Sequence, residues 1–212
     1  MQKRAVPFRD YFLLDINPVI RFLILSDIIW ILGTGLLGPI FALFIVEFIE
    51  GGNAAVAGVA ATIYLTTKSI FQMPIASFID RIRGEKDDFW MMFCGSLGMV
   101  LMPTLYLFTH TPLQLYAVQF LYGIVGACTF PAFMAIFTRH IDKTKEGTEW
   151  GLYFALTDLS SATAASVGGI LASTVGFHWV IGAVVGLGCL GVLILLPIRP
   201  YIYGQERKNA VR

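Results

Sequence analysis

The sequence has little charge for its length, and this scarcity excludes most classes of soluble protein. Asp, Glu, Lys and Arg make up 14% of the 212 residues, whereas 57% are hydrophobic, and the mean hydropathy is +0.74. A soluble domain carries about a quarter charged residues and needs them to stay dissolved. We therefore expect a lipid bilayer to surround most of the protein.

Residue patterns for metal, disulfide and nucleic-acid chemistry are also missing. The net charge is only +1, without the clustered basic excess that a nucleic-acid partner would need. Cys94, Cys128 and Cys189 lie inside apolar runs without CxxC or CxxH spacing, which is typical of small buried hydrophobes. No His/Glu metal spacing and no Gly-rich phosphate loop occur. We expect no metal and no cofactor.

An intramembrane enzyme is the main rival class for a chain this apolar. A rhomboid-like serine protease would need a G-x-S-G motif and a membrane-buried histidine, but Ser96 stands in the order Gly-Ser-Leu-Gly. The three histidines, His110, His140 and His178, fall at helix ends or at a membrane boundary. We therefore expect the protein not to be an enzyme.

Six apolar runs are long enough to cross a bilayer, which takes a helix of about 20 residues. They cover residues 18–48, 54–79, 88–109, 112–139, 149–173 and 177–198. Asn17-Pro18 and Thr111-Pro112 each place a side-chain acceptor at the N-cap and proline at the first helical position, which marks two helix starts. The sequence predicts an all-α membrane protein with an N-terminal segment over 1–17, a six-helix domain over 18–198 and a tail over 199–212.

The distribution of basic residues predicts the orientation in the membrane. All but two of the 15 Lys and Arg residues lie before the first helix, in the second–third loop, around the fourth–fifth loop or in the tail. The loops near 50–53, 109–111 and 174–176 have none; Arg21 and Lys68 lie within helices. By the positive-inside rule the basic side is cytoplasmic, so we expect both termini in the cytoplasm and the helices in a cell (inner) membrane.

The loop between the second and third predicted helices contains a recognisable sequence motif. Residues 76–86 read ASFIDRIRGEK, which resembles the G-x-x-x-D-R-x-G-R-R loop signature of the major facilitator superfamily. Asp80 and Arg81 match the signature, Ala76 replaces its leading glycine, and Gly84 and Lys86 are displaced by one residue. The runs 33–39 and 123–139 resemble the family's first and fourth helices, with Gln119 where an arginine is expected. The resemblance covers essentially the whole chain.

The resemblance implies a secondary transporter that moves a small solute by alternating access, as symporter or antiporter. Family members usually have twelve helices in two parallel six-helix halves, and this sequence supplies the equivalent of one half. Because the number of spans is even, two copies would share one orientation, so we predict a parallel homodimer with the transport path at its two-fold interface. The alternatives are a fragment, a half that acts with another six-helix partner, and a transport-inactive scaffold.

Ionisable residues inside the membrane are costly and mark solute or ion pathways. Asp27, Lys68 and Asp158 each lie about 14–16 Å from the basic side, close to mid-bilayer. A cation between two anions could leave one carboxylate able to take a proton, which would suit a proton-coupled carrier. A buried ion pair that only fixes helix packing is the alternative.

Uncharged polar residues extend this candidate site. Tyr64 and Gln72 lie one turn before and after Lys68, so the three form a polar stripe on one helix face. Gln119 could hydrogen-bond a solute, and a role in joining two helices is equally consistent with its position. The expected site for solute or proton coupling is therefore Asp27, Tyr64, Lys68, Gln72, Gln119 and Asp158.

By the resemblance, Asp80 belongs to a cytoplasmic latch, in which an acidic residue meets the N-terminus of a helix in the other half. In a homodimer that helix would be the fifth helix of the second copy, which begins near Thr148-Glu149. The residues assigned to the latch are Asp80, Arg81, Arg83, Gly84, Lys86, Arg139 and Glu149. Ordinary loop solvation accounts equally well for the arginines.

Overall fold

Six helical spans form the protein in the computed structural model, which describes residues 16–81 and 84–210. The first span joins α1 (Pro18–Thr34), η2 (Gly38–Ile40) and α2 (Phe41–Phe48), and the second is α3 (Ala54–Arg81). The third joins α4 (Lys86–Leu101) to η3 (Met102–Phe108), and the fourth is α5 (Pro112–His140). The fifth is α6 (Glu146–Val175), and the sixth joins α7 (Phe177–Leu193), η4 (Leu196–Ile198) and α8 (Arg199–Ala210).

The helix starts follow the capping residues. The Asn17 side chain accepts a hydrogen bond from the Val19 amide at 2.9 Å. Thr111 and Gln114 form a reciprocal capping box at the start of α5. Both predicted helix starts are confirmed. Each cap satisfies backbone donors that have no partner within the helix.

Besides the prolines that begin the first and fourth spans, four prolines lie inside the first four spans, and they act in two different ways. Pro39 and Pro103 stand in the short 3-10 segments η2 and η3, where the α-helical hydrogen-bond pattern of the first and third spans is interrupted. Pro74 and Pro131 lie inside α3 and α5, which continue through them. Each of these four prolines removes a backbone donor, but the helix changes from α to 3-10 only at Pro39 and Pro103.

The first helix of each half of the chain packs mainly against helices of the other half. The first three spans begin with α1, yet α1 packs mainly against α6 and α7 of the second three. Conversely, α5 begins the second three spans and packs against α3 and α4. This arrangement is typical of the three-plus-three repeats within a six-helix transporter half.

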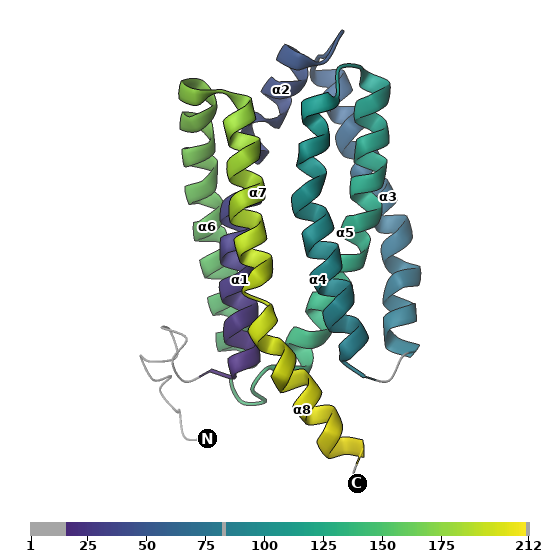
Figure 1. Cartoon of the computed structure of the whole chain (residues 1–212), viewed down its shortest axis with the longest axis vertical. Helices are drawn as coiled ribbons and strands as arrows, with labels where there is room; N and C mark the ends of the chain where they lie inside the picture. Colours follow the sequence, from purple (N-terminus) through teal and green to yellow (C-terminus); the bar gives the residue numbers. More distant parts are fainter. Residues whose placement is uncertain (1–15, 82–83, 211–212) are drawn as a thin grey trace.

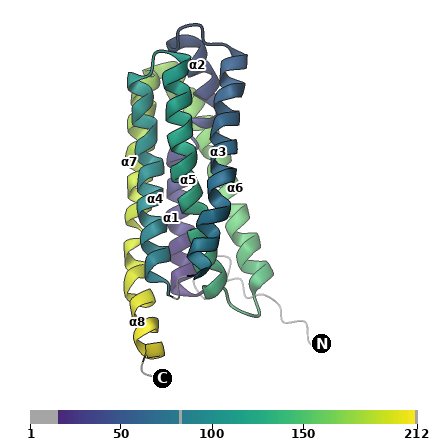
Figure 2. The ribbon, with the colours of Figure 1, turned by 90° about the vertical axis from the view of Figure 1, so that its right-hand side faces the viewer.

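The helices form two outer layers with two further helices between them. In Figure 1, α4 and α7 lie in front, and the quarter turn to Figure 2 brings them to one side, with α3 and α6 on the other. Helices α1 and α5 lie between them, in contact with both layers. The start of α1, the end of α5 and α8 lie at one end of the bundle, here called the basic end because Arg81, Lys86, Arg139 and Arg199 are there.

Close backbone contact joins α1 to α7. The Ser26 hydroxyl donates to the Gly191 carbonyl at 2.7 Å. A Cβ atom on Gly191 would lie 2.7 Å from the Trp30 backbone nitrogen, closer than van der Waals contact permits. Gly191 is therefore required by the approach of the α1 backbone, as in small-residue packing between membrane helices generally.

We predict that Gly191→Ala lowers the stability of the folded protein by about 1–3 kcal/mol, because the methyl group must push α1 away from α7. Gly186→Ala is the matched control: it lies on the same helix, and no atom comes within 4 Å of its added Cβ. Thermal unfolding in detergent should show a lower midpoint for Gly191→Ala alone. Equal midpoints would contradict the packing argument.

Candidate functional site

A cavity of about 240 Å³ lies among α1, α3, α4, α5 and α6. Asp27 and Lys68 are the carboxylate and the ammonium group among its lining residues, and the remainder are hydroxyl-bearing, aromatic or apolar. The lining residues are Ser26, Asp27, Trp30, Ile31, Tyr64, Lys68, Met92, Ser96, Met99, Gly126, Thr129, Phe130, Phe133, Tyr153 and Leu195. The cavity thus combines one acidic and one basic group with an otherwise uncharged wall.

Asp27 comes from α1 and is held by a residue of α6. The Tyr153 hydroxyl donates to Asp27 Oδ2 at 2.8 Å. Tyr153 is itself buried and packs against Phe133 and Phe137, with ring centroids 5.7 Å and 5.4 Å away. The aromatic neighbours therefore restrict the tyrosine ring and direct its hydroxyl at the carboxyl group.

Lys68 enters the cavity from α3, and its ammonium group lies over an aromatic ring of α5. The Nζ atom is 5.4 Å from the centroid of the Phe130 ring. Among the described residues, the ion pairs within 4.0 Å do not include Asp27 with Lys68. The two opposite charges therefore share a cavity while each has a different, uncharged partner.

The other residues of the predicted site lie elsewhere. Asp158 is exposed on α6 and is not among the cavity-lining residues. Gln72 is half-buried on α3 and does not line the cavity either, although Tyr64 and Lys68 of the same stripe do. The structure thus brings together Asp27, Tyr64 and Lys68, and it leaves Asp158 and Gln72 outside.

Gln119 lines a second cavity, of about 270 Å³, toward the opposite end of the bundle. Its amide Nε2 donates to the Tyr106 hydroxyl at 3.2 Å, so it joins α5 to η3. Tyr122 and Tyr64 also line this cavity, and their ring centroids are 5.2 Å apart. Tyr64 lines both the Asp27–Lys68 cavity and the one that contains Gln119.

The chemistry available in the first cavity is polar recognition and proton exchange. It offers an ammonium donor, a carboxyl group with a hydroxyl partner, and the hydroxyl of Thr129. Among the described residues, no group of three His, Cys, Asp or Glu side chains is placed to hold a metal ion. Polar groups of this kind, set in a mostly apolar cavity, are typical of sites that bind small polar molecules.

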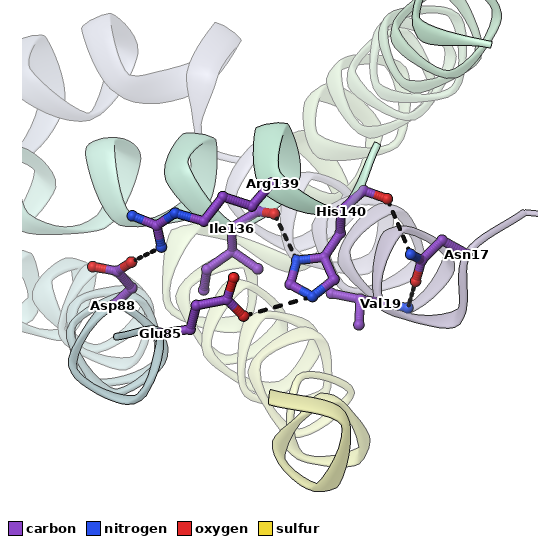
Figure 3. Close-up of polar contacts among 7 residues, drawn as sticks. All are labelled: Asn17, Val19, Glu85, Asp88, Ile136, Arg139 and His140. Atoms are coloured by element: carbon purple, nitrogen blue, oxygen red, sulfur yellow. Dashed lines mark hydrogen bonds and ion pairs between the residues drawn. The ribbon is translucent and has the colours of Figure 1, made fainter. Parts of the chain in front are cut away.

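A second polar cluster, at the basic end, joins three helices (Figure 3). Arg139 of α5 forms an ion pair with Asp88, whose side chain is fully buried in the first turn of α4. His140 Nε2 lies 3.6 Å from Glu85 Oε2, and its Nδ1 lies 3.0 Å from the Ile136 carbonyl. The Asn17 amide donates to the His140 carbonyl at 3.0 Å, which ties the start of α1 to the end of α5.

Among the residues that the structure describes, those assigned to the latch lie in different surroundings. Asp80 and Arg81 are exposed at the end of α3, and Arg83 lies outside the described residues. The Lys86 ammonium group lies 4.8 Å from the centre of the Tyr203 ring. Glu149 is fully buried and accepts a hydrogen bond from the Asp142 amide at 3.3 Å, so its side chain packs within its own chain.

Sequence reasoning missed Tyr153, Asp88 and His140 as partners in these clusters. Tyr153 could have been noticed as a hydroxyl within the apolar fifth span, but only the packing of α1 on α6 makes it the partner of Asp27. An acidic residue such as Asp88 in the first turn of a helix is suited to the helix N-terminus in any case, so its place in the sequence does not predict its pairing with Arg139. His140 gave no signal beyond its place at a helix end.

The fold and the cavity define a multi-pass membrane protein with a polar site inside the membrane-spanning bundle. Residues 19–210 match the family model described as Major Facilitator Superfamily. The chain belongs to this family. It is also similar to an uncharacterized transporter of Bacillus subtilis (strain 168), YybO, with 25% identity over 159 residues. That match covers 75% of this chain and 35% of YybO, so the chain spans well under two thirds of this relative.

We predict that Arg139→Gln destabilises the fold by about 3 kcal/mol, because it leaves the buried Asp88 carboxylate without its cation. This figure is at the low end for buried pairs because the Arg139 side chain is 36% exposed. Unfolding in a graded denaturing detergent measures the loss. Arg81→Gln, at an exposed position, should be neutral, and the double change Asp88→Asn/Arg139→Gln should recover part of the loss. Equal stability of Arg139→Gln and the native chain would refute the pairing.

Proposed function

We propose that this chain is one half of a secondary transporter that moves a small solute across a cell membrane by alternating access. One observation carries the proposal: a carboxyl group and an ammonium group from different helices face the same cavity within the membrane-spanning bundle. Charged groups are expensive in lipid and are retained where they serve a solute or ion pathway. Membership of a transporter family supports the same conclusion.

Proton coupling, by symport or antiport, is the form of transport that the cavity favours. Asp27 is the group that would take up and release the proton, since its partner is a neutral tyrosine rather than a cation. Lys68 would attract an anionic group of the solute or respond to the charge on Asp27. A change of charge at Asp27 would then bias the inward-open against the outward-open state.

The second half is expected to cover α3 and α6. These two spans have the lowest buried shares of the six. Asp158 is exposed on α6, well within a span, where a carboxylate facing lipid would be strongly unfavourable. A second copy in parallel orientation would cover this surface and complete a twelve-helix transporter, with the basic end and both termini in the cytoplasm.

The exposed position of Asp80 supports a latch between copies. Asp80 lies at the basic end of α3, and α6 begins at the same end with Glu146. In a parallel dimer Asp80 could approach the free amides at the start of the partner's α6. Gly84, Lys86, Arg139 and Glu149 would then support the latch indirectly, by holding the loops and helix ends around it.

Asp27→Asn should reduce pH-driven uptake by at least about tenfold, within the range of about 5- to 150-fold that coupling between two sites usually spans. Candidate solutes come from a thermal-shift panel of organic acids, amino acids, sugars and organic cations. Uptake of those that stabilise the protein is then measured in proteoliposomes, with and without a pH gradient.

Ser77→Ala is the control for this experiment, because Ser77 is exposed on α3 and its hydroxyl donates to the Met73 carbonyl of its own helix. Tyr153→Phe should give an intermediate loss, since it removes one hydrogen bond to Asp27. Unchanged pH-driven uptake in Asp27→Asn would exclude this proton site. An absence of uptake for every solute that binds would favour a scaffold.

The proposed homodimer leads to a separate prediction. Native mass measurement in mild detergent should detect two copies, and Asp158→Lys should shift the population toward one copy by at least about tenfold, because it alters a charge on the covered face. Glu47→Lys, a charge reversal at another exposed position, on α2, is the control. Detection of monomers alone, with uptake intact, would exclude the homodimer. Uptake that depends on a different six-helix chain would indicate a heteromeric transporter.

A further inference from the structure

Three side chains of the Asp27–Lys68 cavity have hydrogen-bond donors that no described residue accepts. Lys68, Tyr64 and Ser96 all line the cavity, and within the described parts of the chain none of them makes a side-chain hydrogen bond or an ion pair. The face of the Phe130 ring, 5.4 Å from Lys68 Nζ, attracts the positive charge but does not replace the oxygen acceptors that an ammonium group prefers. The cavity therefore has more donors than it can satisfy.

The acidic side of the cavity is in a different condition. Asp27 is the carboxyl group among the lining residues, and its Oδ2 atom already accepts the Tyr153 hydroxyl. A ligand that brings acceptors would satisfy the donors around Lys68, whereas a ligand with an ammonium group would add further donors. The lining therefore favours an anionic ligand, held mainly by Lys68.

The charges of the cavity limit such a ligand to a single negative charge. Asp27 and Lys68 sum to zero when both are ionised, and an uncompensated charge within a membrane-spanning bundle is costly. A monoanion bound to Lys68 would leave the Asp27 carboxylate as the excess charge. One proton on Asp27 brings the sum back to zero.

The surroundings of Asp27 leave this carboxyl group as the proton acceptor. The titratable groups that line the cavity are Asp27 on α1, Tyr64 and Lys68 on α3, and Tyr153 on α6. Lining residues from α4 and α5 have hydroxyl, thioether or aromatic side chains or none. Helix α7, which also packs on α1, has no Asp, Glu, Lys or Arg, and its His178 and Cys189 do not line the cavity. A dianion would need a second proton acceptor, which these residues do not supply.

The size and the wall of the cavity define the rest of the ligand. A cavity of about 150 Å³ lined by apolar side chains is large enough for benzene. The volume here is about 240 Å³, and Ile31, Met92, Met99 and Phe133 contribute apolar wall. The space therefore fits a body the size of one ring together with one carboxylate group.

We propose that the Asp27–Lys68 cavity binds a small monocarboxylate with an apolar body, together with one proton on Asp27. The carboxylate accepts hydrogen bonds from the Lys68 ammonium, and the Tyr64 and Ser96 hydroxyls are further donors. The solute brings one negative charge and the proton one positive charge, so the transported pair is uncharged. This inference rests on the proposed function, since it names the solute class and the proton count of the same site.

Four molecules with a shared body test the charge of the ligand on the native full chain in detergent. Phenylacetate is anionic, phenylacetamide neutral, phenethylamine cationic and phenylglycine zwitterionic. Isothermal titration calorimetry should show the tightest binding for phenylacetate, by about tenfold or more, as expected for a hydrogen bond between charged groups. Equal or tighter binding of any of the other three, or no binding of phenylacetate, would overturn the proposal.

The proton count is measured by repeating the titration in buffers that differ in ionisation enthalpy. Between about pH 6 and 9, proton uptake by the native chain should reach about one per phenylacetate bound, because binding raises the proton affinity of Asp27. Asp27→Asn should bind phenylacetate without taking up a proton. No uptake by the native chain anywhere in this range, or the same uptake by Asp27→Asn, would refute the role of Asp27.

Variants of Lys68 test the anion-binding group. Lys68→Gln should weaken phenylacetate binding by about tenfold or more, and Lys68→Arg should keep most of it because the charge remains. Arg21→Gln is the matched control, since Arg21 also lies over an aromatic ring, at 5.6 Å, but does not line the cavity. Equal affinity of the native chain and a folded Lys68→Gln variant would contradict the assignment.

Uptake into proteoliposomes separates this inference from the proposed function. Phenylacetate uptake should follow an imposed pH gradient and should not change with an imposed membrane potential, because the transported pair is uncharged. A response to the potential would contradict the count of one proton. Lys68-dependent binding without any uptake would support the solute class and contradict transport. Asp27-dependent uptake of a cation or a neutral solute in place of phenylacetate would support transport and overturn the solute class.

Discussion

The constraint on which the structure depends is the absence of water from the hydrocarbon core of a bilayer. Every backbone donor and acceptor must then be satisfied within its own helix, and every charged side chain needs a cavity or a partner. This explains why all regular elements among the described residues are helices. It also explains why Asp27 and Lys68 point into one cavity, where a tyrosine hydroxyl and an aromatic face replace water as their neighbours.

That cavity forms because the first helix of each half of the chain packs against the other half. Packing of α1 on α6 brings Tyr153 to Asp27, and packing of α5 on α3 brings Phe130 under Lys68. If each group of three spans packed only within itself, Tyr153 and Phe130 of the second group would not reach Asp27 and Lys68 of the first. The functional chemistry is thus a consequence of the topology, and small residues such as Gly191 permit the close contacts that the topology requires.

The two ends of the bundle differ in how they are held. At the basic end, the Asp88–Arg139 ion pair and the bonds of His140 and Asn17 connect α1, α4 and α5 around a buried apolar core. At the opposite end, aromatic rings connect the first and sixth spans, as between Phe44 and Phe177 with centroids 4.3 Å apart. In the proposed transporter, a polar basic end can exchange ion pairs with a second half more readily than an apolar end can.

The sequence alone determined the class of the protein. Low charge and six apolar runs specify the number of membrane helices, and Asn17 and Thr111 specify where two of them begin, because capping and hydropathy are local properties. The loop around Asp80, together with the runs 33–39 and 123–139, predicted the family, and the match of residues 19–210 to the family model confirms it. The distance of a residue from the helix end could likewise be counted from the sequence, so Asp27 and Lys68 were predicted to lie at the same depth in the membrane.

Only the tertiary structure decided which way each side chain points. A helix rotates by about 100° per residue, so two residues at equal depth can face a cavity or the surface, and nothing local distinguishes them. Asp27 and Lys68 therefore line the cavity while Asp158 is exposed. The partners Tyr153, Asp88 and His140 likewise followed from which helices pack together, a choice that depends on contacts between residues far apart in the chain.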